Sequence, residues 1–202
     1  IYLIKKFPIL RVHGEEWRWR GHFVARLCGM GIPMGLQYSI TAIGSVILQT
    51  AVNGLGSVVV ASMTAGGKLS MFFCCPFDAF GSTMATYAGQ NLGAGKLDRV
   101  TKGMVQCSFV AAGYSVVAAV VMILFGKSFA LLFVDSTEVE IIANVAKLLI
   151  INSLFFIPLA LVNIIRFAIQ GLGFGKLAIF AGVAEMVGRS IVGFGFVARF
   201  GF

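Results

Sequence analysis

The sequence predicts an all-α membrane protein, a polytopic bundle of about five transmembrane helices. Hydrophobic residues make up 58% of the chain and charged residues only 12%, and the mean hydropathy is +0.94, far from the values of soluble domains. Residues 27–67 carry no formal charge, a stretch longer than the roughly 20 residues that a helix needs to cross a bilayer. We expect helices because a backbone exposed to lipid must satisfy its own hydrogen bonds, and short alternating segments are lacking.

Apolar runs and the polar loops between them define five spans. Proline lies inside the first, second and fourth of them, at Pro33, Pro76 and Pro158, where it removes a helical hydrogen bond and predicts a kink. The third span has no proline and is typical of a rigid packing helix. The predicted spans, in chain order, are 27–53, 58–89, 103–126, 141–170 and 177–199.

A glycine motif follows the second and the fourth span. The pattern Gln-x-Leu-Gly-x-Gly-Lys-Leu occurs at residues 90–97 and again at 170–177, with six of its eight positions identical. Each copy closes one apolar run and opens another, which indicates a short turn or hinge reused at one edge of a membrane domain. Neither copy has the glycine spacing of a phosphate-binding P-loop. The candidate hinge and loop residues are Gly93, Gly95, Lys96, Gly173, Gly175 and Lys176.

The positions of Lys and Arg predict how the spans are oriented, because these residues collect in short cytoplasmic loops. Threading five spans back and forth places ten cations on one side and only Lys127 and Arg199 on the other. The net charge of +8 is explained by this orientation. Nucleic acid is not an expected partner, since the cations follow loops with no binding module around them. The ten cations are Lys5, Lys6, Arg11, Arg18, Arg20, Arg26, Lys96, Arg99, Lys102 and Lys176.

The N-terminal residues 1–26 are basic, and tryptophans at 17 and 19 alternate with arginines at 18 and 20. This alternation is typical of an interfacial segment with its rings at the depth of the headgroups. The chain opens without an initiator Met and stops on an apolar residue. We therefore expect a fragment of a longer membrane protein.

The sequence predicts no metal site and no cofactor. Its four cysteines show no metal-ligand spacing, and neither histidine has a second ligand in register. An enzyme is disfavoured because no nucleophile, base or metal cluster converges.

Polar residues recur at every fourth position inside the apolar spans. Two interpretations stay open: such side chains join helices by hydrogen bonds, or they line a water-accessible passage. Residues four apart lie on nearly one face of a helix, and that face avoids lipid. The candidate residues of a substrate or ion pathway are Gln37, Thr41, Ser45, Gln49, Asp78, Ser82, Asn163 and Arg166.

Charged residues at membrane depth are treated separately. Asp78 is a functional-site hypothesis by default, although pairing with Lys68 or Arg166 would make it structural. Glu185 and Arg189 are four residues apart in the fifth span. Their spacing predicts an internal ion pair.

Several of these segments resemble the multidrug and toxic compound extrusion (MATE) family. The resemblance rests on residues 89–100, on residues 170–173 and, more weakly, on residues 32–37. The Glu185-x-x-x-Arg189 spacing is similar to the eleventh helix of bacterial members. The resemblance implies helices seven to eleven of a two-lobed protein, so that residues 27–202 are an incomplete six-helix C-terminal lobe. Residues 1–26 would then connect it to an N-terminal lobe of the same polypeptide.

The resemblance implies an antiporter of the plasma membrane, the bacterial inner membrane. Such a protein expels small amphipathic or cationic compounds in exchange for Na⁺ or H⁺, through a cleft between its lobes. The sequence departs from branches that carry an acidic residue in the seventh and tenth helices. It has Gln37 in the former and Asn152, Asn163 and Arg166 in the latter, which directs the search for the coupling site elsewhere, including the other lobe.

Two alternatives remain. A related two-lobed exporter flips lipid-linked sugars, but its pyrophosphate cargo needs several cations at depth. A structural membrane subunit without transport activity would use the polar stripes only to join helices.

Overall fold

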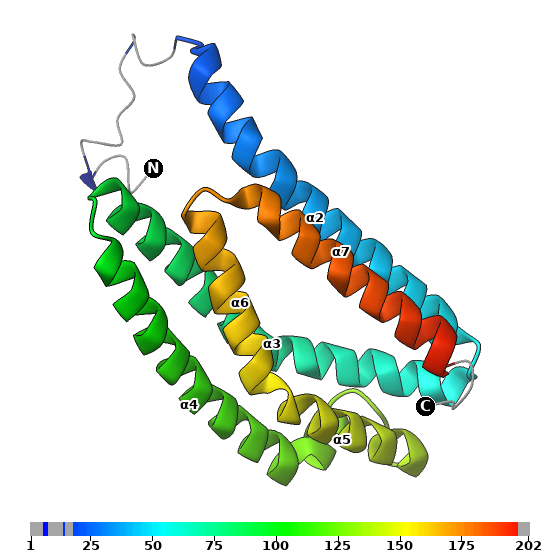
Figure 1. Ribbon diagram of the computed structural model, residues 1–202. Coiled ribbons are helices and arrows are strands. Elements are labelled where there is room, and N and C mark those ends of the chain that lie inside the picture. The colour runs from blue at the N-terminus through cyan, green and yellow to red at the C-terminus, as the bar shows by residue number, and fades with distance from the viewer. Residues whose placement is uncertain (1–5, 8–13, 15–17, 198–202) are drawn as a thin grey trace.

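The computed structural model describes residues 6–7, 14 and 18–197, and its regular structure from residue 21 onward is helical (Figure 1). This confirms the predicted all-α polytopic bundle. In chain order the elements are α2 (Gly21–Asn53), α3 (Ser57–Gly93), α4 (Leu97–Ala130), α5 (Val139–Leu154), α6 (Phe156–Gly171), α7 (Gly175–Ile191) and the π-helix η3 (Val192–Val197).

The helices agree with the five predicted spans. By length and composition, α2, α3, α4 and the segment Gly175–Gly195 can each cross a membrane, and α5 with α6 can form a fifth span bent by 53°. Most helices extend past the predicted limits; α2, for example, begins at Gly21 inside the basic segment. The difference arises because charge marks the hydrocarbon layer, about 30 Å thick, whereas a helix can continue into the headgroups and water.

Five of the ten predicted cytoplasmic cations, Arg26, Lys96, Arg99, Lys102 and Lys176, lie in or next to segments at one end of the bundle. These segments are the beginning of α2, the α3–α4 turn and the α6–α7 turn (Figure 1). The opposite end holds the α2–α3 turn and the α4–α5 loop. Several residues named from the sequence, namely Lys5, Arg11, Trp17 and Arg199, lie outside the described residues.

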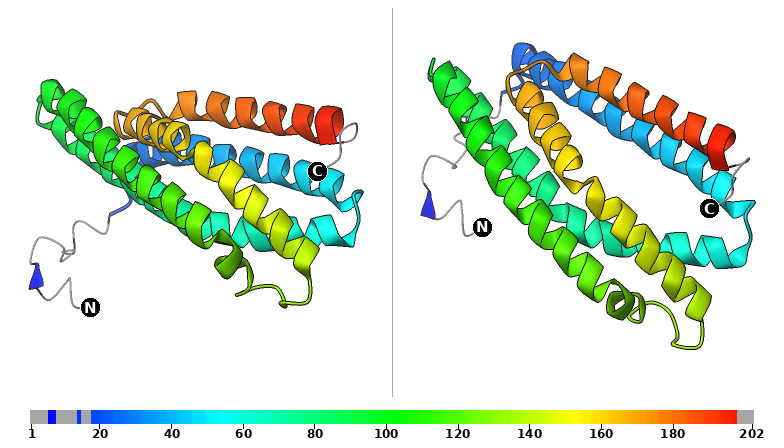
Figure 2. Two further views of the ribbon diagram at one scale, coloured as in Figure 1. Left: turned by 90° about the horizontal axis from the view of Figure 1, so that it is seen from below. Right: turned by 60° about the horizontal axis from the view of Figure 1, so that its bottom comes forward.

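Two of the three prolines inside the predicted spans mark bends. Leu154 ends α5 and Pro158 is the third residue of α6, a first-turn position where a missing N–H costs no helical hydrogen bond. Helix α3 continues through Pro76 but bends near its midpoint (Figures 1 and 2). There the Tyr114 hydroxyl of α4 donates to the carbonyl of Phe73 at 2.9 Å, so a neighbouring helix satisfies backbone at the bend.

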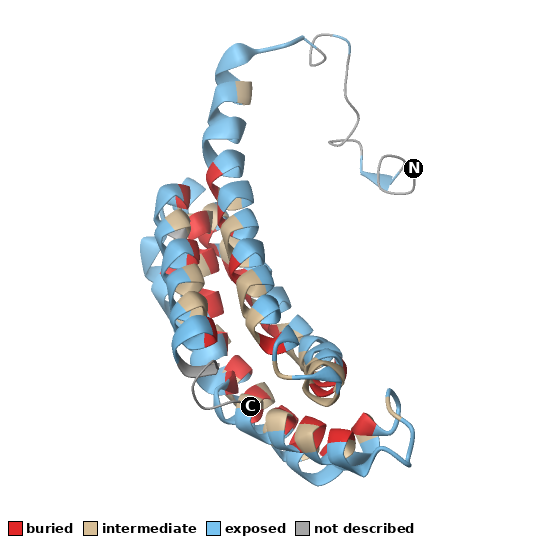
Figure 3. Ribbon diagram, turned by 90° about the vertical axis from the view of Figure 1, so that its right-hand side faces the viewer, coloured by how far each residue is buried: buried red, intermediate tan, exposed pale blue. Residues whose placement is uncertain are grey.

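The helices form two groups. One consists of α2 and α7, which run side by side (Figure 2), and the other of α3, α4, α5 and α6. Glycines allow the close approach within the first group: a Cβ added at Gly182 would lie 3.1 Å from the Gln37 side chain, and one at Gly44 would lie 3.1 Å from the Met186 backbone. Buried residues follow the facing surfaces of the helices (Figure 3).

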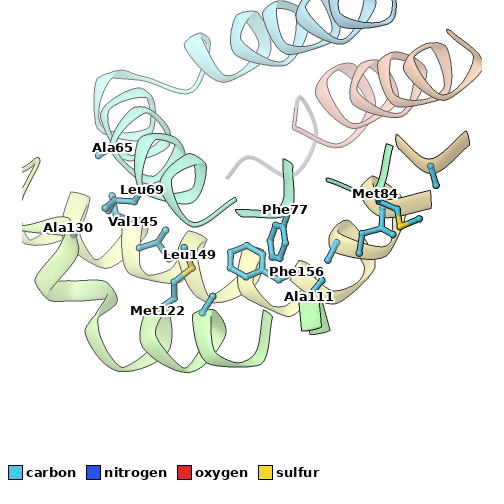
Figure 4. Packing of buried hydrophobic residues seen from close by; sticks show 14 of the residues in the cluster. Ala65, Leu69, Phe77, Met84, Ala111, Met122, Ala130, Val145, Leu149 and Phe156 are labelled. Atoms are coloured by element: carbon cyan, nitrogen blue, oxygen red, sulfur yellow. The ribbon is translucent and has the colours of Figure 1, made fainter. Parts of the chain in front are cut away.

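An aromatic cluster lies at the centre of the second group. The Phe77 ring packs edge to face against Phe156 and against Tyr114, with ring centroids 5.4 Å apart in both pairs. Phe77 is completely buried and Phe156 is 2% exposed. Leu149, Val145 and Met122 continue this core toward the α4–α5 end (Figure 4). The cluster therefore joins the bend of α3 to the break between α5 and α6.

The two glycine motifs form the same kind of turn in different registers. Both are Schellman turns: Lys96 N donates to Asn91 O at 2.8 Å, and Phe174 N donates to Ile169 O at 3.1 Å. The left-handed glycine is the sixth motif residue in the first copy, Gly95, and the fourth in the second, Gly173. The second helix therefore ends two motif positions earlier.

Close packing accompanies this shift. Gly171, which is Asn91 in the first copy, lies against the backbone of α3, and an added Cβ would overlap the Ala85 carbonyl oxygen. A Cβ at Gly89 would in turn lie 3.2 Å from the Gly171 carbonyl oxygen. The end of α6 thus touches α3 backbone to backbone.

We expect Phe77→Ala to destabilise the full-length protein by about 3–5 kcal/mol, because it empties a fully packed site. Phe72→Ala is the matched control on the same helix, since Phe72 is 74% exposed. The measurement is the temperature at which the protein loses its monodisperse elution peak in detergent. Equal shifts for both variants would contradict the assignment of Phe77 to the core.

Gly171→Ala is expected to cost at least about 1–3 kcal/mol, because the clash is with backbone and no rotamer can relieve it. Gly93→Ala, at the end of α3 with no atom within 4 Å of the added Cβ, should be neutral or slightly stabilising. The same thermal assay compares the two alanines. A harmless Gly171→Ala would show that α3 and α6 do not meet in this way.

Candidate functional site

A cavity of about 830 Å³ lies between the two helix groups. Residues of α2 and α7 line one wall, and residues of α3, α6 and the α5–α6 break line the other. The side chains that give the cavity its apolar surface include Met71, Phe155, Leu159 and Val162. Its polar side chains are Gln37, Tyr38, Thr41, Asp78, Asn163, Arg166, Glu185 and Arg189.

The structure gathers five of the eight predicted pathway residues around this cavity: Gln37, Thr41, Asp78, Asn163 and Arg166. The other three lie elsewhere. Ser45 bonds to α7, Gln49 is exposed and donates to Asn53 at 2.9 Å, and the exposed Ser82 donates to the Ala79 carbonyl of its own helix at 3.0 Å. The polar stripes therefore do not continue as a passage from end to end.

Asp78 and Arg166 face the cavity with Asn163 between them. The Asn163 amide nitrogen approaches Asp78 Oδ1 at 3.5 Å, longer than an ordinary N–H···O hydrogen bond. Arg166 Nη2 donates to the Asn163 amide oxygen at 2.7 Å. Among the described residues, Asp78 forms no ion pair with Lys68 or with Arg166, and its contact is with the Asn163 amide.

Gln37 links the two helix groups. Gln170 of α6 donates from Nε2 to Gln37 Oε1 at 2.8 Å, and both side chains are buried. This contact agrees with the interpretation of the stripe as a means of joining helices. The residue also lines the cavity, so the two interpretations of Gln37 are compatible.

The predicted ion pair of α7 is present. Arg189 Nη2 lies 2.5 Å from Glu185 Oε1, and α2 binds both partners. Thr41 donates to Glu185 Oε2 at 3.3 Å, and Arg189 Nη1 donates to Ser45 at 2.6 Å. The two charges neutralise each other, and the Thr41 and Ser45 hydroxyls of α2 each add one hydrogen bond to the pair.

Sequence reasoning missed that Glu185 and Arg189 line the cavity, and it missed Tyr38 and Cys74 altogether. Helical spacing could have predicted that some of these residues share a face with Asp78. Cys74 lies one turn before Asp78, and Met71 lies three residues before Cys74, a spacing that keeps side chains on one face. Among the described residues, no group of three or more His, Cys, Asp or Glu side chains is placed to hold a metal ion.

Comparison with known proteins assigns the chain to a family. The MatE family model matches residues 33–194, which include most of α2 and all of α3 to α7. A probable multidrug resistance protein, YpnP of Bacillus subtilis (strain 168), is 28% identical over 114 residues. That alignment covers 56% of this chain and 26% of the relative, so this chain matches only about a quarter of the relative's length. No solved structure gives a significant match.

The family match and the helical architecture agree with the resemblance carried by the glycine motifs. The chain is a multi-pass membrane protein with bent apolar helices, and a cavity with polar and apolar side chains lies between its two helix groups. It belongs to the MATE family.

Proposed function

We propose that this chain is one lobe of a secondary transporter that exports small amphipathic compounds, organic cations among them, in exchange for Na⁺ or H⁺. The observation that carries the proposal is the cavity, which places Asp78, Asn163 and Arg166 beside an apolar wall at the centre of membrane-spanning helices. Ionisable groups at that depth are costly, and they mark substrate and ion paths in transporters.

The size and lining of the cavity support a drug-sized ligand. Its volume of about 830 Å³ falls in the range of small-molecule sites, roughly 300–1,000 Å³. Its apolar side chains suit the body of an amphipathic compound, and Asp78 offers a carboxylate that is only weakly bound by Asn163. An N-terminal lobe of the same polypeptide would form the rest of the path, with the lipid bilayer around it in the plasma membrane.

The alternative cargo, a lipid-linked sugar, receives less support. Pyrophosphate groups are recognised by several Arg or Lys donors. Among the described residues, Arg166 and Arg189 are the arginines that line the cavity, and Arg189 is already paired with Glu185, so Arg166 is the one that remains. A structural subunit does not need a cavity of this size with separated charges.

The test uses the full-length protein in liposomes with an imposed Na⁺ or H⁺ gradient and a fluorescent organic cation inside. We expect gradient-dependent export, and the gradient that drives it identifies the coupling ion. A protein that exports no cationic dye under either gradient would contradict the proposal.

Asp78→Asn should reduce the initial rate of export of that cation at least about tenfold, because a charge-assisted contact contributes on this scale. Asp98→Asn is the matched control, since it removes a carboxylate from the first turn of α4, outside the residues that line the cavity. The measurement is dye fluorescence against time at equal protein content. Unchanged export by Asp78→Asn would remove the carboxylate from the mechanism.

A further inference from the structure

The cavity contains two kinds of charge. Glu185 and Arg189 neutralise each other directly, with N and O 2.5 Å apart, and α2 supports both. Asp78 and Arg166 also have opposite charges, but each contacts Asn163 in place of the other. The second pair is therefore separated, and both of its members line the cavity.

Both separated groups retain hydrogen-bonding capacity. A guanidinium has five N–H donors, and the hydrogen bond of Arg166 is that from Nη2 to Asn163. Its Nε is buried without a hydrogen-bond partner, and its Cζ lies 5.4 Å from the centre of the Phe167 ring. Asp78 is exposed, and its hydrogen-bond contact within the described part of the chain is the long one from Asn163.

This separation affects which ligands fit. A ligand with a single positive charge would pair with Asp78 but leave Arg166 uncompensated in the same cavity. The electrostatic cost of an uncompensated charge rises when water is displaced from around it. A ligand with one positive and one negative group would compensate both residues and keep the charge of the occupied cavity at zero.

We propose that the cavity selects amphipathic zwitterions, with the cationic group at Asp78 and an anionic group, such as a carboxylate, at Arg166. This proposal rests on the proposed function and narrows its substrate class. The apolar body of the ligand lies against Met71, Phe155 and Val162. Asn163 then exchanges its bonds to protein charges for bonds to the ligand.

The test compares two dyes that differ only in one charge. Tetramethylrhodamine is a zwitterion at neutral pH, and its methyl ester is a cation with the same aromatic body. We expect the full-length protein in phosphatidylglycerol nanodiscs to bind the zwitterion about tenfold more tightly, because a hydrogen bond to a charged group contributes on that scale. Fluorescence anisotropy measures both dissociation constants. Once binding to empty nanodiscs is subtracted, because their anionic lipid itself attracts the ester, equal or tighter binding of the ester overturns the proposal.

Arg166→Gln should weaken binding of the zwitterion about tenfold and leave binding of the ester the same or tighter. Arg166→Lys retains the charge and should keep the preference. Lys147→Gln removes a cation from α5 that does not line this cavity and should affect neither dye. Equal loss of both dyes in a normally eluting Arg166→Gln protein would overturn the proposal, because the residue would then act on packing alone.

Zwitterionic lipid headgroups share this chemistry, and a second bilayer separates the two sources. If the zwitterionic dye binds more weakly in nanodiscs of phosphatidylethanolamine, the lipid headgroup competes for the site. Equal binding in both lipids assigns the site to soluble zwitterions.

A measurement of export separates this inference from the proposed function. Gradient-driven export of the ester without any preference for the zwitterion would overturn only the inference, whereas selective binding without export would overturn only the transport function.

Discussion

The contact between Phe77, Phe156 and Tyr114 is the interaction on which the site depends. It joins the bend of α3 to the break between α5 and α6. Asp78 follows Phe77 in the chain and Phe155 precedes Phe156, and successive residues of a helix point about 100° apart. The same two segments therefore present rings to the core on one side and cavity residues on the other. The contact between the rings therefore helps to set the position of Asp78 relative to α6.

Lipid limits what can hold such helices together. Apolar surface gains little by leaving lipid for another helix, so close backbone contact and hydrogen bonds must supply the attraction. Gly171 lets α6 touch α3, and Gly182 lets α7 approach Gln37. The Gln37–Gln170 hydrogen bond connects the two helix groups close to the α6–α7 turn. The cavity is thus bounded by contacts that small residues and amides provide.

The spans and the two turns could be predicted from the sequence because both depend on local properties, apolar length and glycine position. The face of each polar stripe could not. Residues four apart advance by about 400°, so a strict four-residue repeat drifts about 40° at each step. Between Gln37 and Gln49 the drift is about 120°, which is why the first lines the cavity and the second does not. The register of the second turn could not be predicted from the sequence either. It accompanies the contact of Gly171 with Ala85 of α3, a residue far away in the chain.

Asn163 explains how opposite charges can share a small cavity without collapsing into an ion pair. A side-chain amide has a donor and an acceptor on one planar group, so it can face a carboxylate with its nitrogen and a guanidinium with its oxygen. In the structure the Asn163 nitrogen faces Asp78 and the Asn163 oxygen accepts from Arg166. Leucine at this position would offer neither contact, and a carboxylate would neutralise Arg166 while repelling Asp78. The amide therefore keeps the two charges apart. As a result, the α3–α6 wall presents a carboxylate and a guanidinium that are not paired with each other, whereas the two charges of the α2–α7 wall are paired.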